Sequence, residues 1–486
     1  MGEYEVYSDS EGEAKEKEKE EEEKEEKKEK REALQPKHDP APGEASKQEE
    51  QEEEEEEEDW SEWGKSIATE AELNQLLSLC TGNEVIDFNE HIQSELKSST
   101  LSKLGEASYS EVFLQTPHTK SSPPPARTVL KIIPFGYPTQ CPLKQIYDEL
   151  LITVSMAPIP GFIGFHSAHI VRGPFPQPLL DLWDHWDQHV KAGGSENDRP
   201  DFYNEGQLFA VIGLEDGGRD LEAWSFKGEV DGEGGWREAR EVFWRVAGAL
   251  ARGEEEREFE HRDLHFGNIV IKRVPIEVGE SEDEMLRNLS LDDEGGVIAR
   301  TQLQVSLIDY TLSRARGAYG LLSFTPLDDE ALFEGKGDYQ FDIYRFMRSH
   351  LQTLTPNPPL NPLTGLPELD WSQPTPATNL YWLHYLLHIL LHKKKELRKP
   401  PAQSTSSRSR SKGPSGGGGG GIAGFAEEDV LAFRELEGLY KVLDCRPRGS
   451  KRGAPVEESG WGGFGEGASG FVRWAVGEGV VGYGEL

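Results

Sequence analysis

Two polar side chains set five positions apart could carry out phosphate chemistry together. They are Asp263 and Asn268, and they lie in the stretch EHRDLHFGNIVIK from Glu260 to Lys272. A carboxylate held in a loop can accept the proton of a substrate hydroxyl, while an amide oxygen one turn later can hold a metal ion. A polar turn before a buried strand is the alternative interpretation, because the apolar run IVI follows directly.

A lysine inside an apolar strand indicates that an anion lies nearby. Lys131 stands in TVLKII, residues 128–133, and a buried lysine is costly unless an anion pairs with it. A surface lysine on an edge strand is the alternative. Eighteen residues later, Glu149 falls in a segment with helical spacing at Ile146 and Leu150. A strand lysine paired with a helix glutamate fixes the α- and β-phosphates of ATP in protein kinases, whose catalytic loops read H-R-D-L-x-x-x-N like the stretch above.

A second carboxylate follows the strand pattern QVSLI and ends it at Asp309. Magnesium requires hard oxygen ligands close to the phosphates, so we predict that Asn268 and Asp309 hold the metal. Asp309 lies 46 residues after Asp263, and an acidic insertion at 273–300 accounts for the long gap. An ordinary turn residue at the end of a strand is the alternative.

The nucleotide should be covered by the segment KLGEASYSEVFLQ, residues 103–115. Of three expected glycines only Gly105 is present, and Ala107 and Ser110 stand at the other two positions. Small residues there still allow backbone N–H groups to approach phosphate, and Val112 lies on the second strand. A plain hairpin is the alternative, and weak nucleotide binding would follow from the missing glycines.

A buried strand pattern, QLFAVIGL, runs from Gln207 into the turn EDGGRDLE. In a kinase this is the hinge between two lobes, where backbone groups bind adenine. We therefore predict that the segment Leu214, Glu215, Asp216 and Gly217 binds the base, with Asp220 near the ribose.

Composition limits the classes of partner. The 486 residues carry a formal net charge of −37, of which −17 falls on residues 1–60 with 27 acidic and 10 basic side chains, leaving about −20 elsewhere. Direct nucleic-acid binding is therefore not expected, and a basic peptide suits this field. The three widely spaced cysteines favour a reducing compartment, and no apolar stretch is long enough to span a membrane.

The residues quoted so far, together with HRDLHFGN, IDYTLSR (308–314) and GDYQFDIYR (337–345), resemble the haspin family of protein kinases. NDRPDF (197–202) and NLYWLHYL (379–386) are similar to that family too. The resemblance covers roughly residues 101–445, and we expect a fungal-type member. It implies an α+β, bilobal protein-kinase-like fold with a β-rich N-lobe and a helical C-lobe.

The expected organisation has five parts. They are a disordered acidic tail (1–60), an N-terminal extension packing on the N-lobe (61–100), an N-lobe with a family insertion (101–216), a C-lobe with a flexible insert at 401–423 (217–445), and a Gly-rich, unpacked tail (446–486). The acidic tail could bind basic chromatin proteins, or it could be a solvated spacer.

The resemblance also implies roles for individual residues. Asp263 would be the catalytic base, Lys131 and Glu149 the phosphate-anchoring pair, and Asn268 and Asp309 the magnesium ligands. Asp342 would be a helix carboxylate that supports the catalytic loop.

The implied reaction is transfer of the γ-phosphoryl of Mg-ATP to a threonine near the start of the histone H-three tail. Acidic residues in LDDEALFE, residues 327–334, could contact that basic tail. The implied partner is chromatin, the implied location nuclear and chromosome-associated with a possible cytoplasmic pool, and the expected state a monomer. A catalytically weak pseudokinase that binds histone tails as a scaffold, and a small-molecule phosphotransferase, are the other hypotheses.

Overall fold

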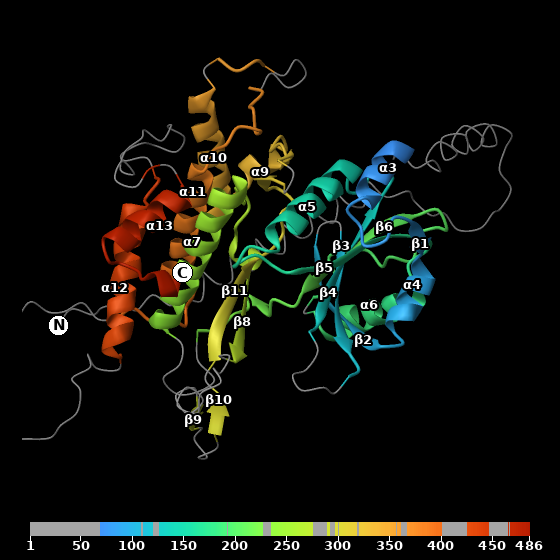
Figure 1. Ribbon diagram of the computed structural model, residues 1–486, viewed down its shortest axis with the longest axis horizontal. Coiled ribbons are helices and arrows are strands. Elements are labelled where there is room, and N and C mark those ends of the chain that lie inside the picture. The colour runs from blue at the N-terminus through green and yellow to red at the C-terminus, as the bar shows by residue number, and fades with distance from the viewer. Residues whose placement is uncertain are drawn as a thin grey trace, which may run out of the picture. The chain divides into compact units, whose positions relative to one another are not determined.

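The computed structural model describes residues 69–486, except 108–109, 120–125, 192, 227–234, 276–288, 292–296, 300, 318–319, 356, 361–366, 401–424, 447–464 and 466. The acidic tail predicted for 1–60 and the flexible insert predicted for 401–423 therefore lie outside the described residues. The described chain is α+β, with a sheet-rich N-lobe and a mainly helical C-lobe (Figure 1).

The N-lobe is built on a mixed sheet with the strand order β1-β5-β6-β4-β3-β2. Its strands are β1 (Val85–Asp87), β2 (Ser99–Ala107), β3 (Ser110–Pro117), β4 (Thr128–Phe135), β5 (Phe165–Arg172) and β6 (Leu208–Glu215). Only the β1–β5 pair is parallel among these neighbours. The central strand β6 is apolar almost throughout because helices cover both faces of the sheet.

Those helices occupy opposite faces, as the alternation along β6 requires. Ala210 and Ile212 pack toward α3 (Glu70–Leu77) and α5 (Leu143–Met156), whereas Phe209 and Val211 pack toward α4 (Phe88–Glu95) and α6 (Gln177–His189). The helix α6 lies in the insertion that the sequence had placed in the N-lobe without assigning it a structure.

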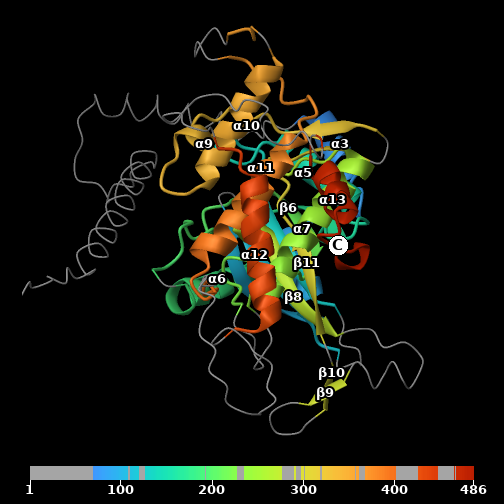
Figure 2. The same cartoon turned by 90° about the vertical axis from the view of Figure 1, so that its left-hand side faces the viewer.

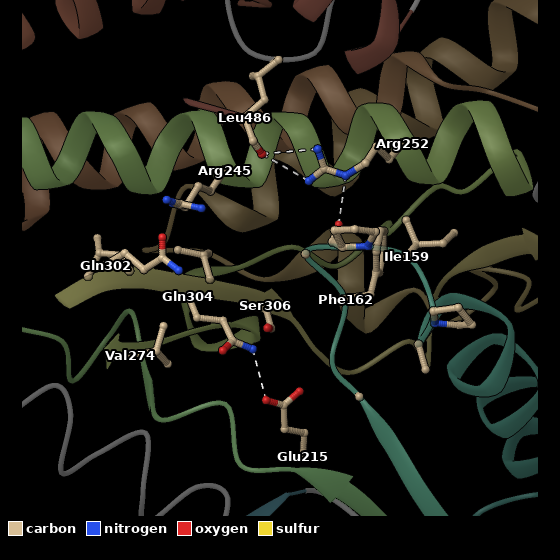
Figure 3. A pocket seen from close by; sticks show the side chains of 17 residues that line it. Ile159, Phe162, Glu215, Arg245, Arg252, Val274, Gln302, Gln304, Ser306 and Leu486 are labelled. Carbon is tan, nitrogen blue, oxygen red and sulfur yellow. Dashed lines mark hydrogen bonds between the residues drawn. The ribbon is translucent and has the colours of Figure 1, made fainter. Parts of the chain in front are cut away.

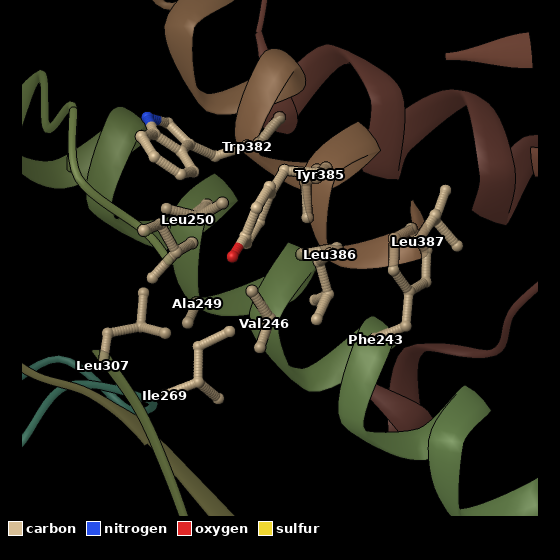
Figure 4. Packing of buried hydrophobic residues seen from close by; sticks show 14 of the residues in the cluster. Phe243, Val246, Ala249, Leu250, Ile269, Leu307, Trp382, Tyr385, Leu386 and Leu387 are labelled. Atoms are coloured by element: carbon tan, nitrogen blue, oxygen red, sulfur yellow. The ribbon is translucent and has the colours of Figure 1, made fainter. Parts of the chain in front are cut away.

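The C-lobe is organised around α7 (Trp236–Arg257), whose apolar face packs against α11 and the strands below it (Figure 4). Gly235 precedes α7, and Glu258 in the left-handed conformation (φ 49°) ends it. Further helices are α9 (Ala331–Glu334), α10 (Gln340–Leu354), α11 (Ala377–His388) continued by the π-helix η2 (Ile389–Lys393), and α12 (Glu427–Val442). Within the described residues, no helix is both long and apolar enough to cross a bilayer.

Short strands carry the segments that surround the catalytic loop. The sheet β11-β8-β7 consists of β7 (Arg219–Asp220), β8 (Ile269–Pro275) and β11 (Thr301–Leu307), and the 3-10 turn η1 (Phe266–Asn268) leads into β8. Two hairpins complete the described strands: β9 (Leu289–Leu291) with β10 (Val297–Ala299), and β12 (Arg314–Arg316) with β13 (Leu322–Phe324).

The prediction that residues 446–486 are unpacked is wrong for the part that the structure describes. The helix α13 (Ala468–Gly477) packs on α7, and the 3-10 turn η3 (Tyr483–Glu485) follows it (Figure 2). Phe471 is fully buried and stacks on Trp244, with ring centroids 5.6 Å apart. Small residues on the same face, Ala468 and Ala475, are also buried, which allows a close approach between the two helices.

Removing the Phe471 ring should therefore destabilise the folded chain. We expect Phe471→Ala to lower the free energy of unfolding by about 3 kcal/mol, because it leaves a cavity between α13 and α7. Arg473→Ala on the same helix, at a side chain 68% exposed, should change it by less than about 0.5 kcal/mol. Urea denaturation followed by tryptophan fluorescence measures both, and equal stabilities for the two variants would contradict a packed α13.

Candidate active site

Three charged side chains from separate elements meet between the lobes. Lys131 on β4 places its Nζ 2.5 Å from Glu149 Oε1 on α5 and 3.7 Å from an Asp309 carboxylate oxygen just after β11. The Thr311 hydroxyl lies 2.5 Å from Asp309 Oδ1 and 3.2 Å from Glu149 Oε2, so it bridges the two carboxylates. The predicted strand lysine and helix glutamate thus form a pair, and Asp309 joins them.

The electrostatics of this cluster keep Lys131 and Asp309 charged, whereas burial raises the pKa of Glu149. Burial alone would raise the pKa of Asp309, but the Lys131 ammonium and the hydrogen bonds from Thr311 outweigh it and lower that pKa to about 2. Burial would lower the pKa of Lys131, but Asp309 and Glu149 together raise it. Asp309 also has a left-handed backbone (φ 60°), a conformation that non-glycine residues adopt mainly where the surroundings impose it.

The catalytic loop places Asp263 and Asn268 beside this cluster. The side-chain amide of Asn268 donates an N–H to the backbone carbonyl of Asp263 at 2.8 Å. The backbone carbonyl of Asn268 accepts the N–H of Ile308 at 3.1 Å. The Tyr344 hydroxyl donates to Asp263 Oδ1 at 2.5 Å. Burial raises the pKa of Asp263 to about 6, although nearby His265 and the Tyr344 hydrogen bond act in the opposite direction. At neutral pH the carboxylate is mostly ionised and can accept a proton.

The donor set next to Asp309 fits magnesium. Because the Asn268 amide nitrogen is engaged with the loop backbone, its amide oxygen is the atom that can accept a cation. Asp309 adds an ionised carboxylate one residue beyond Ile308. Both are the hard oxygen ligands that Mg²⁺ prefers.

A buried ionic group fixes the start of the catalytic loop. Glu260 is 1% exposed and Arg262 fully buried, with the Arg262 guanidinium 3.0 Å from Glu260 Oε2. Glu260 also accepts hydrogen bonds from the Thr375 N–H at 2.5 Å and the Thr378 hydroxyl at 3.2 Å. Arg314 exchanges two backbone hydrogen bonds with Glu260. Arg262 has a φ of 63°, and these contacts hold it in that uncommon conformation.

The prediction that Asp342 supports the catalytic loop is wrong. Asp342 lies on the first turn of α10, is half-exposed, and bonds Arg345 at 2.7 Å on its own helix. The support comes from Tyr344, two residues on, and from Asn379 on α11, whose Oδ1 accepts the backbone N–H of His261 at 3.1 Å. Because successive helix positions point about 100° apart, a two-residue error in register puts the wrong side chain on the loop.

The hairpin predicted to cover the phosphates lies beside the strand that carries Lys131. Gly105 on β2 pairs with Val112 on β3, and Val112 pairs in turn with Lys131 on β4. Ala107, the last residue of β2, is held by a hydrogen bond from the Asn197 amide to its carbonyl at 3.3 Å. Asn197 comes from the insertion that contains α6.

The same insertion fixes Glu106, the residue between Gly105 and Ala107. Glu106 forms an ion pair with Lys191 and accepts hydrogen bonds from the Ser195 hydroxyl at 2.5 Å and the Glu196 N–H at 2.9 Å. A hairpin that lacks two glycines is thus braced from outside by charged and polar contacts.

The hinge leaves suitable backbone atoms for a base. The N–H of Glu215 bonds the Gly164 carbonyl, and Asp216 is engaged through both its N–H and its carbonyl, the latter with Lys272 at 2.8 Å. Among the described turn and loop contacts, the N–H of Gly217 has no backbone partner, and it stays, with the carbonyl of Glu215, a predicted contact for adenine. A Cβ at Gly217 would lie 2.3 Å from Val270 Cγ2, so the close approach requires glycine.

The side chains of the residues predicted for the nucleotide site make contacts within the protein, and their predicted roles stay predictions. The side chain of Glu215 lines a cavity of about 520 Å³, where it contacts Gln304 (Figure 3), and it also pairs with Lys272. Leu214 packs between the main core and the α5 side of the N-lobe sheet. Asp220 lies on β7 and its Oδ1 accepts the N–H of Ala223 at 2.7 Å.

Sequence reasoning missed four supporting residues: Thr311, Tyr344, Asn379 and Glu260. Thr311 and Tyr344 stood inside the motifs IDYTLSR and GDYQFDIYR, and Glu260 began the catalytic-loop stretch, so each was quoted without a role. These three could have been found by asking which non-catalytic polar residues of the motifs form a buried hydrogen-bond network around the catalytic ones. Asn379 is the first residue of NLYWLHYL. A polar residue at the start of an otherwise apolar helix was the signal that could have indicated its role.

These features define the class of protein. A β-rich lobe with a lysine–glutamate pair, joined by a hinge to a helical lobe with an Asp/Asn loop and a second carboxylate, is the protein-kinase fold. Residues 55–411 match the family model described as the haspin like kinase domain. Since that match spans well over half of the chain, the protein belongs to the haspin-like kinase family.

Curated relatives agree with this membership. The chain is 36% identical over 335 residues to the serine/threonine-protein kinase haspin homolog hrk1 of Schizosaccharomyces pombe, covering 66% of this chain and 61% of that protein. It is 33% identical over 339 residues to serine/threonine-protein kinase haspin of Bos taurus, covering 66% and 38% respectively. The Drosophila melanogaster homolog is 32% identical over 341 residues, with 66% and 53% covered. The chain therefore matches less than two thirds of the length of each of these relatives.

Breaking the buried pair beneath the loop should be costly. Glu260→Gln leaves the Arg262 guanidinium buried without a counter-ion, and we expect the free energy of unfolding to fall by about 3 kcal/mol. Glu258→Gln is the comparison, because its side chain is 45% exposed and pairs with Arg316, itself 42% exposed, as well as with the buried Arg314. That change should amount to less than about 1 kcal/mol. Urea unfolding of both variants tests the difference, and a Glu260→Gln protein as stable as the control would refute it.

Proposed function

We propose that this protein is an ATP- and Mg²⁺-dependent serine/threonine protein kinase of haspin type. The observation that carries the proposal is the convergence of Lys131, Glu149, Asp263, Asn268 and Asp309 in one site. Lys131 and Asp309 are held as ions, and the oxygen donors fit magnesium. Each of these groups has a distinct part in phosphoryl transfer, and a site that had lost catalysis need not keep all five.

Different residues of this chain bind different parts of Mg-ATP. Mg-ATP, when bound, supplies the γ-phosphoryl group to be transferred. The hinge atoms at Glu215 and Gly217 orient the base, and Lys131 neutralises the α- and β-phosphates. Glu149 keeps the Lys131 ammonium in place, while Asn268 and Asp309 hold the cation close to the phosphates.

Asp263 orients the substrate hydroxyl and accepts its proton. Tyr344 engages Oδ1 of this carboxylate at 2.5 Å, which fixes the plane of the carboxyl group and leaves Oδ2 for the hydroxyl. Hydrogen bonds link Asp263 to Asn268, and Asn268 to Ile308 next to Asp309. The base and the metal ligands are therefore held in one connected unit. Geometry held in this way lowers the entropic part of the barrier.

We further propose that the substrate is a basic peptide, the start of the histone H-three tail, phosphorylated on a threonine. The carboxylates of Asp338, Asp263 and Glu222 all act on the Tyr385 hydroxyl and, with burial as the main cause, raise its pKa. Asp338 and Glu222 thus act on the same tyrosine as the proposed base, and negative charge of this kind favours cationic side chains. The names of the relatives support serine/threonine protein kinase activity; the histone tail as substrate, and with it a nuclear, chromosome-associated location, is what the resemblance to the haspin family implies.

The acidic segment 327–334 offers fewer unpaired carboxylates to a basic peptide than its sequence suggested. Glu330 forms a bidentate contact with Arg348 at 3.0 and 2.9 Å, so its charge is largely neutralised. Asp329 caps the N–H of Ala331, and both Asp328 and Asp329 are exposed. Glu334 at the end of the segment is exposed as well, so Asp328, Asp329 and Glu334 are the carboxylates of this segment that could meet a basic tail.

The second candidate function is a catalytically weak scaffold that binds histone tails. The shortage of glycines in the phosphate-covering hairpin favours it, but the contacts of Glu106 and Asn197 hold that hairpin in place without them. We therefore favour the active kinase.

The brace on the hairpin gives a direct test. Glu106→Gln removes the ion pair with Lys191 and should raise KM for ATP about 5-fold, since a charged hydrogen bond of this kind contributes about 1 kcal/mol. Glu196→Gln is the matched control, because Glu196 also contacts Lys191 but its side chain is 82% exposed. Steady-state kinetics at varied ATP measure both variants. Equal KM values in the two variants would show that the brace does not support nucleotide binding.

The function itself is tested with Mg-ATP and a peptide of the histone H-three tail. We expect phosphate transfer to threonine by the wild type, and a loss of at least about 100-fold in kcat for Asp263→Ala, which lacks the base. Mass spectrometry of the peptide identifies the modified residue. Peptide binding without transfer by the wild type would favour the scaffold, and transfer that survives Asp263→Ala would refute the role of Asp263.

A further inference from the structure

A hydrogen-bond path connects the C-terminal helix α13 to the catalytic loop. The N–H groups of Ala468 and Ser469, at the start of α13, donate to the two carboxylate oxygens of Glu254 on α7, each at 2.8 Å. The Asn379 amide donates to Glu254 Oε1 at 2.9 Å. Asn379 Oδ1 then accepts the backbone N–H of His261 at 3.1 Å.

The inner end of this path is shielded from water, whereas Glu254 and Ser469 at its outer end are partly exposed. Asn379 and His261 are both fully buried. Burial is the main influence on Glu254 and raises its pKa to about 7, against the effect of the hydrogen bonds from Ser469, Asn379 and Ala468. Two of the residues that hold Glu254 in place belong to α13, so the position of this carboxylate depends on that helix.

The far end of the path reaches both halves of the active site. His261 stands two residues before Asp263, and its ring Nε2 lies 3.1 Å from the carbonyl of Ile308, next to Asp309. A shift of His261 therefore moves the base and the metal-binding segment relative to each other. Asn379 also donates to the Phe259 carbonyl at 2.9 Å, so it holds the loop at two points.

We propose that Glu254 and Asn379 are positioning residues through which α13 keeps the catalytic loop in the geometry for phosphoryl transfer. This inference rests on the proposed kinase function. It concerns a helix that lies beyond residues 55–411, the part of the chain that matches the family model. The stacking of Phe471 on Trp244 anchors α13 to α7 and makes the N-terminus of α13 a rigid support for Glu254.

A substitution at Gly467 disturbs the path without changing any of its hydrogen-bonding groups. Gly467 immediately precedes α13 and has a φ of 122°, and a Cβ there would lie 2.8 Å from both Glu254 Oε2 and Pro376 Cβ. Gly467→Ala must therefore shift α13, the Glu254 carboxylate or Pro376, and any of these shifts changes the contact between α13 and Glu254. Gly477→Ala, at the other end of the same helix, is the matched control, because no heavy atom lies within 4 Å of its Cβ position.

The kinetics should separate positioning from stability. At a temperature well below both unfolding transitions, we expect Gly467→Ala to lower kcat about 10-fold with KM for ATP within about 2-fold of wild type, as a misplaced catalytic group does. Amide hydrogen exchange of the loop peptide 259–268 should be faster in this variant. Gly477→Ala should leave both properties at their wild-type values.

A double variant tests whether one path carries the effect. Asn379→Ala should lower kcat by a similar factor, and adding Gly467→Ala should lower it little further, because both changes interrupt the same connection. Losses that multiply in the double variant would overturn the proposal. Wild-type kcat and loop exchange in Gly467→Ala would also overturn it. If the wild type transfers no phosphate, the proposed function fails, and the exchange measurement alone still decides whether α13 holds the loop.

Discussion

The ammonium of Lys131 lies between two carboxylates, and the arrangement of both lobes depends on that contact. A buried lysine is tolerated only with anions close by, and here they come from α5 and from the end of β11. The contact therefore ties the register of β4, the placement of α5 and the position of Asp309 to one another. Thr311 adds a hydroxyl that bridges the two carboxylates.

The catalytic loop has a separate foundation on the C-lobe side. Glu260 and Arg262 form a buried pair beneath it, Tyr344 orients the base, and Asn379 holds the backbone at His261. None of these groups reacts with substrate. They fix the loop so that the reacting groups are already in place, which is how a rigid framework contributes to phosphoryl transfer.

The groups proposed to carry the chemistry could be predicted from the sequence, because phosphate chemistry requires certain residue types at certain spacings. Lys131, Glu149, Asp263, Asn268 and Asp309 all meet in one site. The supporting residues were harder to find, since their partners are set by tertiary packing. The choice of Asp342 over Tyr344 failed for that reason: both lie on α10, and only the way the helix packs decides which one faces the loop.

The C-terminal segment shows a second limit. Its glycines and short apolar runs have no clear helical period, so sequence alone favoured an unpacked tail. The helix α13 forms because α7 provides a surface for Phe471 and because Glu254 accepts its first N–H groups, and neither condition is visible in local composition.

The central claim is that the Lys131–Glu149–Asp309 cluster forms a site for magnesium-bound nucleotide. Calorimetric titration of ATP into the wild type and into Asp309→Asn, each with and without Mg²⁺, tests this claim directly. The account predicts that Mg²⁺ tightens ATP binding to the wild type by about 10-fold or more, and that Asp309→Asn loses most of this gain. Equal ATP affinity of the wild type with and without Mg²⁺, or the same gain in Asp309→Asn, would contradict it.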